Sequence, residues 1–292
     1  MSYRTVYITE RCRCSYQNGY LVVRQDKQTM IHLSEISMMV IESTATYISS
    51  YLMSELAKEC IPVVFCDVQH NPIGQYSPIY GAHNSTKRIR EQIAWNKGIA
   101  DRLWQRIVVS KIHNQAVILA RLGLAQTTML REYEECVQLG DASNREGHAA
   151  KVYFNALFGN GFNRDKECGI NAQLNYGYSI LLAWLNREIT ARGQLTQLGI
   201  NHCNEYNHFN LSCDFMEPFR PVIDWYVVNH SEQELGKQAK MELLTLFDDY
   251  YYIEQGRYRL SSILSLFTKT NLAILAQRGE IDAYVEFSLD EG

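Results

Sequence analysis

The polar stretch GINHCNEYNHFNLSCDFMEPFRP at residues 199–221 contains residue types that could carry out chemistry. It holds two of the eight histidines, two of the five prolines and three carboxylates, of which Asp214 and Glu217 lie three positions apart. One imidazole, from His202, together with carboxylates favours a hard divalent ion, Mg²⁺ or Mn²⁺, of which Mn²⁺ tolerates nitrogen better. Asp-x-x-Glu before an apolar helix also resembles a capping box. Both interpretations hold if Asp214 caps the helix and Glu217 binds the ion.

A second candidate lies in REGHAAKVYFNALFG at residues 145–159. Helical spacing puts two alanines and a tyrosine on the face of Glu146, and the small alanines leave room for a metal ion or a phosphate. The alternative is that Glu146 only interacts with the positive end of the helix dipole, behind a cap at Asp141 or Ser143. The residues alone leave both interpretations open.

Several common classes are excluded by what the sequence lacks. It has no GxGxxG, Walker A, GxSxG or HExxH pattern, which argues against the common nucleotide-binding, hydrolase and zincin sites. The eight cysteines form no CxxC pair, so a zinc ribbon is not expected. Without an export signal or a long apolar run we expect a cytoplasmic protein with reduced thiols and no membrane contact.

Charge is distributed unevenly along the chain. The net charge is −4, yet residues 83–131 carry nine Lys and Arg against two Asp and Glu. Such asymmetry is typical of a surface that binds a polyanion, and we expect DNA phosphates to contact Lys87, Arg88, Arg90, Arg102 and Arg106. The alternative is a solvated helix that happens to be basic.

The N-terminal region is expected to be rich in strands. TVYI, GYLVV, TMIHL and, later, IPVVFCD cluster β-branched and aromatic residues, and Asn18-Gly19 is typical of a hairpin turn. A helix is expected at about residues 45–59. Prolines and a glycine between residues 69 and 78 predict a linker.

Beyond residue 84 the apolar residues recur mostly at helical spacing. The expected helices are 85–122 with an interruption near Gly98, 127–138, 143–158, 170–192, 214–228, 236–248 and 260–288. The fold class expected is α+β. A small β-rich N-terminal domain (1–72) and a linker (73–84) precede a larger all-α domain (85–292); the family resemblance described below implies that the first is a dimerisation domain and the second the catalytic domain.

Four motifs together carry a family resemblance. REGHAAKVYFNALFG, NYGYSILLAWLNREI, GQLTQLGINH and FNLSCDFMEPFRPVID resemble, in order and spacing, the motifs of the CRISPR-associated integrase, the first-numbered and universal protein of spacer acquisition. The resemblance runs from the N-terminal domain through about residue 228. The length and the MEPFRP ending are most like the version in type II (II-A) systems. Residues 195–199 lack the proline of the commoner GLxPxLG form, which puts the geometry of this loop in question.

The resemblance implies roles for particular residues. Glu146 matches the first metal-binding acid, His202 the metal-binding histidine, and Glu217 the last acid, where many members have Asp. Asp214 matches a further acidic position near the metal and is a supporting candidate. A Mg²⁺ or Mn²⁺ cofactor is implied, with catalysis by Glu146, His202 and Glu217. The resemblance also implies a homodimer, and a complex in which two such dimers hold a dimer of the second CRISPR-associated protein.

The expected function is that of a metal-dependent DNA integrase and endonuclease of CRISPR adaptation, part of antiviral defence. It would insert short fragments of foreign double-stranded DNA into the repeat array by attack of a 3′-hydroxyl on a phosphodiester. One alternative keeps the metal but uses water as the nucleophile, as in a structure-specific repair nuclease. The other is a metal-free DNA-binding scaffold in which Glu146 and Glu217 only cap helices.

Overall fold

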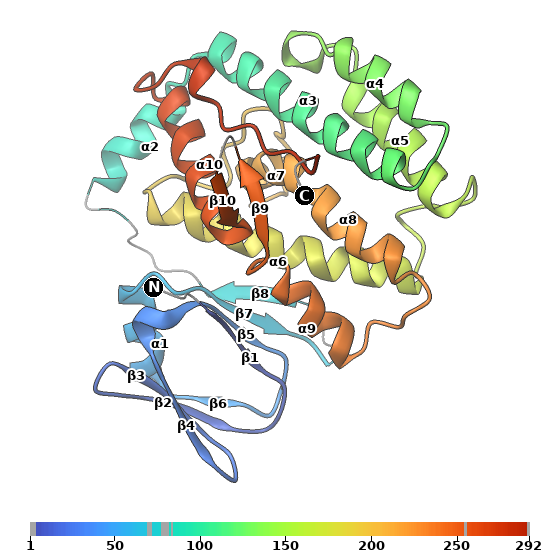
Figure 1. Cartoon of the computed structure of the whole chain (residues 1–292). Coiled ribbons are helices and arrows are strands. Elements are labelled where there is room, and N and C mark those ends of the chain that lie inside the picture. The colour runs from blue at the N-terminus through green and yellow to red at the C-terminus, as the bar shows by residue number, and fades with distance from the viewer. Residues whose placement is uncertain (1–3, 69–71, 77–81, 83, 254–255, 291–292) are drawn as a thin grey trace. The chain divides into compact units, whose positions relative to one another are not determined.

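The computed structural model divides into two compact units (Figure 1). The first unit is Met1–Ser85 with Ile189–Gln194, and the second is Thr86–Glu188 with Leu195–Gly292. The residues that the structure describes are 4–68, 72–76, 82, 84–253 and 256–290. Among them, no helix combines the length and the apolar character needed to cross a membrane.

The first unit contains two four-stranded sheets and helix α1 (Ser50–Lys58). Its strands are β1 (Arg4–Ile8), β2 (Arg13–Gln17), β3 (Tyr20–Arg24), β4 (Gln28–His32), β5 (Ile36–Ile41), β6 (Tyr47–Ile48), β7 (Val63–Cys66) and β8 (Pro72–Tyr76). One sheet has the order β1-β5-β7-β8 and is parallel except at its edge strand β8; the other has the order β4-β3-β2-β6. Apolar side chains of both sheets and of α1 form one core.

The turn between β2 and β3 is the predicted Asn18-Gly19 turn. Both residues have positive φ, 48° and 86°, which asparagine and glycine tolerate best. The four predicted strands are present as β1, β3, β4 and β7. The predicted helix begins only at Ser50, because the Ser49 side chain caps it and the two residues before that pair with β2.

The linker expected at residues 73–84 is wrong in its first part. β8 pairs antiparallel with β7, so residues 73–76 belong to the sheet. The proline that suggested a linker is compatible with β8 because this strand lies at the sheet edge. Residues 77–81 and 83 lie outside the described residues.

The second unit is mainly helical and is organised around α3 (Lys97–Arg121). The other helices are α2 (Ser85–Ile93), α4 (Thr127–Glu135), α5 (Arg145–Phe158), α6 (Gly169–Ala191), α7 (Asn210–Met216), α8 (Arg220–Asn229), α9 (Lys237–Thr245) and α10 (Leu260–Leu275). α3 packs against α4, α5, α7, α8 and α10, and Figure 1 shows α4 and α5 alongside it. The expected interruption near Gly98 is confirmed, since Asn96 caps a new helix there. The α+β fold class is confirmed.

The second unit departs in two places from the all-α domain with a last helix at 260–288 that was expected. β9 (Tyr250–Ile253) and β10 (Gly256–Arg259) form an antiparallel hairpin, and their tyrosine-rich sequence favours strands. The helix expected at 260–288 ends at Leu275, followed by Gln277 with a φ of 55°.

The tail beyond α10 contains only a short 3₁₀ turn, η4 (Ile281–Ala283). Val285, Phe287 and Leu289 are buried while the residues between them are more exposed, the period-two pattern of extended chain. Asn114 on α3 holds this tail: its side chain donates to the Phe287 carbonyl at 2.9 Å and accepts from the Leu289 N–H at 2.8 Å. The expected helix is therefore wrong over its second half.

Candidate active site

The candidate site is built on the buried middle of α3. Lys111 lies one turn after Ile107 and one turn before Gln115 on this helix, and it is only 4% exposed. Its ammonium group forms ion pairs with Glu146 Oε1 and Glu217 Oε2. Burial lowers the pKa of Lys111, but the charges of Glu217 and Glu146 outweigh burial and raise it above its usual value. Lys111 is thus a buried cation that joins two carboxylates.

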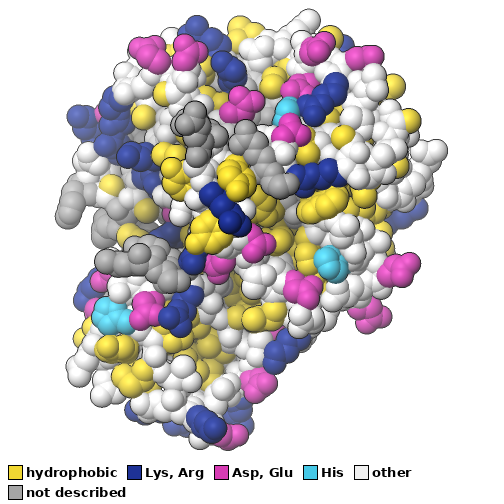
Figure 2. Space-filling model, viewed as in Figure 1, with side chains coloured by type: hydrophobic (Ala, Val, Ile, Leu, Met, Phe, Trp, Pro, Cys, Tyr) yellow, Lys and Arg dark blue, Asp and Glu magenta, His cyan; other side chains and the backbone are white. Residues whose placement is uncertain are grey.

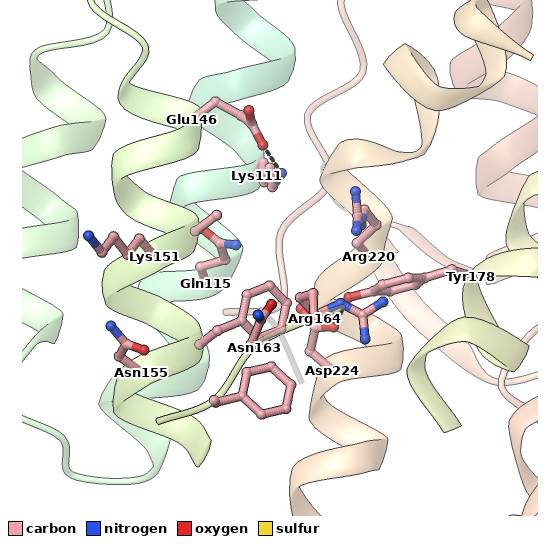
Figure 3. Close-up of a pocket in the computed structure, with 13 residues that line it drawn as sticks. Lys111, Gln115, Glu146, Lys151, Asn155, Asn163, Arg164, Tyr178, Arg220 and Asp224 are labelled. Carbon is pink, nitrogen blue, oxygen red and sulfur yellow. Dashed lines mark hydrogen bonds and ion pairs between the residues drawn. The ribbon is translucent and has the colours of Figure 1, made fainter. Parts of the chain in front are cut away.

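Glu146 comes from the first turn of α5. Asn144 caps this helix by accepting a hydrogen bond from the N–H of Gly147 at 3.3 Å. The Asp141 carboxylate accepts from the N–H groups of Arg145, at 2.8 Å, and Glu146, at 3.0 Å. The cap was expected at Asp141 or Ser143; the N-cap residue is Asn144, and Asp141 adds hydrogen bonds to the first two N–H groups of α5, which starts two residues later than expected. Because other side chains cap the helix, the Glu146 carboxylate is left to contact Lys111 (Figure 3).

Glu217 enters the site at a break between α7 and α8. It begins the 3₁₀ turn η3 (Glu217–Phe219), and Pro218 accounts for the break because it has no N–H to continue the helical hydrogen bonds. Glu217 is 3% exposed. Its Oε1 accepts a hydrogen bond from Arg220 Nη1 at 2.9 Å, while Oε2 faces Lys111.

The Glu217 carboxylate is strongly stabilised as an anion. Burial by itself raises the pKa of Glu217, but the charges of Arg220 and Lys111 outweigh it and lower the pKa to about 2. The Oε2 atom is ion-paired with the Lys111 ammonium, and among the described residues it has no donor besides Lys111. A carboxylate oxygen whose only partner is a cation can also bind a metal ion.

Asp214 holds His202 and its loop in place. Asp214 is fully buried, and its Oδ1 accepts from the Nδ1 and the backbone N–H of His202 at 2.7 and 3.0 Å. Its Oδ2 accepts from the N–H groups of Ile200 and Asn201 at 2.6 and 3.3 Å. The helix cap predicted at Asp214 is wrong, since α7 begins at Asn210 and both Asp214 oxygens bind the loop.

His202 is therefore oriented with one ring nitrogen engaged. The hydrogen bond to Asp214 raises the pKa of His202; burial lowers it by less, and the charges of Asp214, Glu217 and Glu146 raise it further. Because Nδ1 serves Asp214, Nε2 is the nitrogen left for a ligand.

Glycine and glutamine shape the loop before His202. A Cβ at position 199 would overlap the His202 carbonyl and lie 2.6 Å from Asp214 Oδ2, so only glycine lets the carboxylate approach the loop. Gln92 Nε2 donates to the carbonyls of Leu195 and Leu198 at 2.8 and 3.0 Å, and its Oε1 accepts from the Leu195 N–H. These bonds hold residues 195–199 without the family's proline.

The donor set fits Mg²⁺ or Mn²⁺. Glu146 and Glu217 meet at one ammonium group, and His202 lies within the electrostatic influence of both. Two carboxylates and one oriented imidazole are ligands that a hard divalent ion accepts. Within the described ranges, no three His, Cys, Asp or Glu side chains already group as a metal site; the Lys111 ammonium lies between the two glutamates. Asp214 supports the set but offers no open oxygen.

A cavity of about 340 Å³ opens beside Glu146 and Lys111. Figure 3 shows these two side chains at its upper edge, with Lys151 on one side and Arg220 on the other. The Arg220 guanidinium lies 4.3 Å from the ring centre of Tyr178, whose hydroxyl donates to Asp224 Oδ1. Other lining residues include Arg164, Asn155, Asn163, Phe154 and Phe162. Four cations and two carboxylates line this hollow, an arrangement that suits a phosphate-bearing substrate.

Sequence reasoning missed Lys111, Arg220 and the cavity residues. A signal for Lys111 existed: a lysine in the middle of a helix whose neighbours one turn away are apolar or amide residues must be buried, and a buried lysine needs a carboxylate partner. Nothing in the sequence indicates which carboxylates these are.

The basic residues of α2 and early α3 are distributed around the surface. Helix α2 carries three basic residues, Lys87, Arg88 and Arg90, called the α2 basic triplet here. Figure 2 shows Lys and Arg side chains grouped over α2. Two of the three share Glu91, at 4.0 Å from Lys87 and 3.4 Å from Arg88. On α3, Arg102 is exposed and Arg106 lies 4.0 Å from Asp282.

A second hollow, of about 540 Å³, lies between α2, the start of α3 and the His202 loop. Gln92, Trp95, Lys97 and His202 are among its lining residues. His202 is the one candidate metal ligand that lines it, and the α2 basic triplet, Arg102 and Arg106 do not line it.

Comparison with known proteins gives the family of this chain. The family model described as CRISPR associated protein Cas1 matches residues 6–242. The chain belongs to the Cas1 family. It is 35% identical over 274 residues to the CRISPR-associated endonuclease Cas1 of Neisseria meningitidis, covering 91% of this chain and 89% of the relative. The family expected from the four motifs is confirmed.

Solved structures share the Cas1 fold. A casposase bound to integration product superposes with a TM-score of 0.79 at 16% identity, covering 100% of this chain and 94% of the other. A chain of a Cas6-RT-Cas1–Cas2 complex superposes with a TM-score of 0.77 at 20% identity. The match covers 99% of this chain and 36% of the other chain.

Proposed function

We propose that this chain is a metal-dependent DNA integrase and endonuclease of CRISPR adaptation. The observation that carries the proposal is the convergence of Glu146 and Glu217 on one point, with His202 oriented by Asp214 beside them. Two comparisons support this class of reaction. The Neisseria relative is named an endonuclease, and the casposase of similar fold is bound to an integration product.

The proposed ligands of the Mg²⁺ or Mn²⁺ ion are Glu146, Glu217 and Nε2 of His202. When bound there, the ion supplies Lewis-acid polarisation of a phosphoryl oxygen. Asp214 keeps the proton of the imidazole on Nδ1, so that Nε2 presents its lone pair. Arg220 holds Glu217 through one oxygen and so leaves the other directed into the centre.

The proposed substrate is double-stranded DNA, as prespacer and as repeat. In strand transfer a 3′-hydroxyl oxygen gives up its proton to solvent and bonds to phosphorus as the bond to another 3′-oxygen breaks, and that departing oxygen takes up a proton from solvent. Arg164 and Arg220 line the cavity next to Glu146, where their charges offset the negative charge of a phosphate. The α2 basic triplet, Arg102 and Arg106 are proposed to contact the DNA backbone further out.

The partners are also proposals. We propose a homodimer formed through the first unit, and assembly with a dimer of Cas2, since the matched chain of the Cas6-RT-Cas1–Cas2 complex has this fold. Because the proposed assembly contains Cas2, the integration assay must include this partner protein.

The test uses a duplex with free 3′-hydroxyl ends and a supercoiled plasmid carrying a repeat, with Cas2 and Mn²⁺ or Mg²⁺. We expect covalently joined strands from the wild type and a loss of about 100-fold or more in Glu146→Ala, His202→Ala and Glu217→Ala. Glu205→Ala, an exposed acid in the His202 loop, serves as the control and keeps its activity.

The outcomes separate the alternatives. Joined product that persists in all three variants contradicts the site. Cleavage without joining, even with the partner present, favours the repair nuclease. DNA binding without cleavage or joining at any metal concentration favours the scaffold.

A further inference from the structure

Lys111 occupies an unusual position for a positive charge. It contacts two side chains that are proposed to bind a cation, and it reaches them from the middle of a buried helix. A surface lysine could swing away, but Lys111 is enclosed by α3, α5 and η3, which pack against one another. Its charge is therefore a fixed part of the centre.

The charges around the centre limit how many ions it accepts. Glu146, Glu217 and Asp214 contribute three negative charges, and Lys111 and Arg220 contribute two positive ones. The buried Asp224, on which the charges of Arg220 and Lys111 act, adds a fourth negative charge when it is ionised. With a neutral His202, the sum is then two negative charges. One divalent ion neutralises this sum, whereas a second ion would leave two uncompensated positive charges in a buried site.

The two carboxylate oxygens of Glu217 have different partners. Oε1 is bound by Arg220, and among the described residues Oε2 has no donor besides Lys111. Glu146 likewise turns one oxygen to Lys111 and lines the cavity. Two-metal phosphoryl-transfer sites place two cations between shared carboxylates. Here one position between the shared carboxylates is taken by an ammonium group.

We infer that Lys111 is a resident cation of the centre: it holds Glu146 and Glu217 together without metal, opposes the incoming ion by charge, and replaces a second ion. This inference rests on the proposed function, because it concerns the same metal ligands. Lys111 acts through the ligands and is a positioning residue. The centre consequently takes one divalent ion and binds it weakly for its number of carboxylates.

The experiment compares Lys111→Met with the wild type by calorimetric titration of MnCl₂ in the absence of DNA, and by thermal unfolding with and without Mn²⁺. We expect one Mn²⁺ per wild-type chain, and at least about tenfold tighter binding of Mn²⁺ to Lys111→Met because a nearby like charge is gone. Without metal, the variant should unfold on the order of 10 °C lower, since two buried carboxylates lose their partner, and Mn²⁺ should restore most of that loss.

Two further variants sharpen the result. Lys97→Met removes an exposed lysine from the first turn of the same helix and should change Mn²⁺ affinity less than about twofold. Lys111→Arg keeps the charge and should bind Mn²⁺ as weakly as the wild type. If Lys111→Met does not fold without metal, Lys111→Gln retains polar contacts and carries the same expected tightening.

The possible failures are distinguishable. Equal or weaker Mn²⁺ binding by folded Lys111→Met and Lys111→Gln overturns the inference about Lys111 and leaves the metal centre intact. A wild-type chain that binds two Mn²⁺ ions also overturns it. If neither the wild type nor the variants bind Mn²⁺, the proposed function itself fails, and the inference fails with it.

Discussion

Asp224 provides a quantitative test of the electrostatics of the cavity. This carboxylate is 1% exposed, and burial raises its pKa to about 6 in spite of the Tyr178 hydrogen bond and the Arg220 charge. A carboxyl group with a raised pKa stabilises the fold while protonated, below its ordinary value of 3.8, and this contribution is lost as the pH rises through about 6.

The size of this effect follows from the two pKa values. Integrating the linkage relation for 3.8 and about 6 gives a stability that falls by about 2 kcal/mol between pH 4 and pH 7. Asp224→Asn keeps an oxygen that accepts from Tyr178 but removes the titration. The variant should therefore lose about 2 kcal/mol less than the wild type over this range, whatever constant offset its amide group adds.

The assay is urea unfolding followed by tryptophan fluorescence at pH 4, 5, 6 and 7. All four tryptophans lie in the second unit, so the signal reports on the unit that contains Asp224. His202 titrates in both proteins and cancels in the difference. The control is Asp282→Asn, whose side chain is largely exposed and which should run parallel to the wild type. Parallel curves for Asp224→Asn and the wild type refute the reasoning.

Three further predictions address the ligands, the tail and the DNA path. Asp214→Asn should lower the pKa of His202. Because Mn²⁺ binding strengthens as the imidazole loses its proton, the pH midpoint of binding should move to lower pH, while the affinity at pH 8 should drop about 10- to 100-fold. An unchanged midpoint in the titration contradicts this. Asn114→Leu removes three buried hydrogen bonds and should cost about 3 kcal/mol in urea unfolding, against less than 1 kcal/mol if the tail is unimportant. Reversing the α2 basic triplet to glutamate should reduce the salt slope of DNA binding, measured by anisotropy, by about 2; an equal slope moves the DNA path elsewhere.

The candidate metal ligands were predicted from the sequence because each lies in a motif that resembles a family motif. Glu146 precedes small residues at helical spacing, and His202 and Glu217 flank a polar loop and two prolines. The positions of the acidic residues relative to the helix ends were predicted less well. Asp214 was expected at a cap, yet α7 begins earlier and its carboxylate turns back to the loop. Capping patterns are local, and a buried carboxylate responds to whichever donors the fold brings to it.

The errors in the fold have the same origin. The tail beyond Leu275 carries apolar residues that satisfy either periodicity over a short window, and its contact with Asn114 comes from another part of the chain. β8 contains a proline and a glycine, Pro72 and Gly74, that locally favour a turn, but the edge of β7 pairs with it.

By itself, the sequence determined the helices and strands with clear periodicity, the Asn18-Gly19 turn, the family, and the identity of three candidate ligands. Only the tertiary structure decided that Lys111 lies between Glu146 and Glu217, that Asp214 serves the His202 loop, and that arginines border the cavity beside them. The physical reason is that periodicity and turn chemistry act between neighbours in the chain. The charge of a buried site, in contrast, depends on which distant side chains are enclosed together without water.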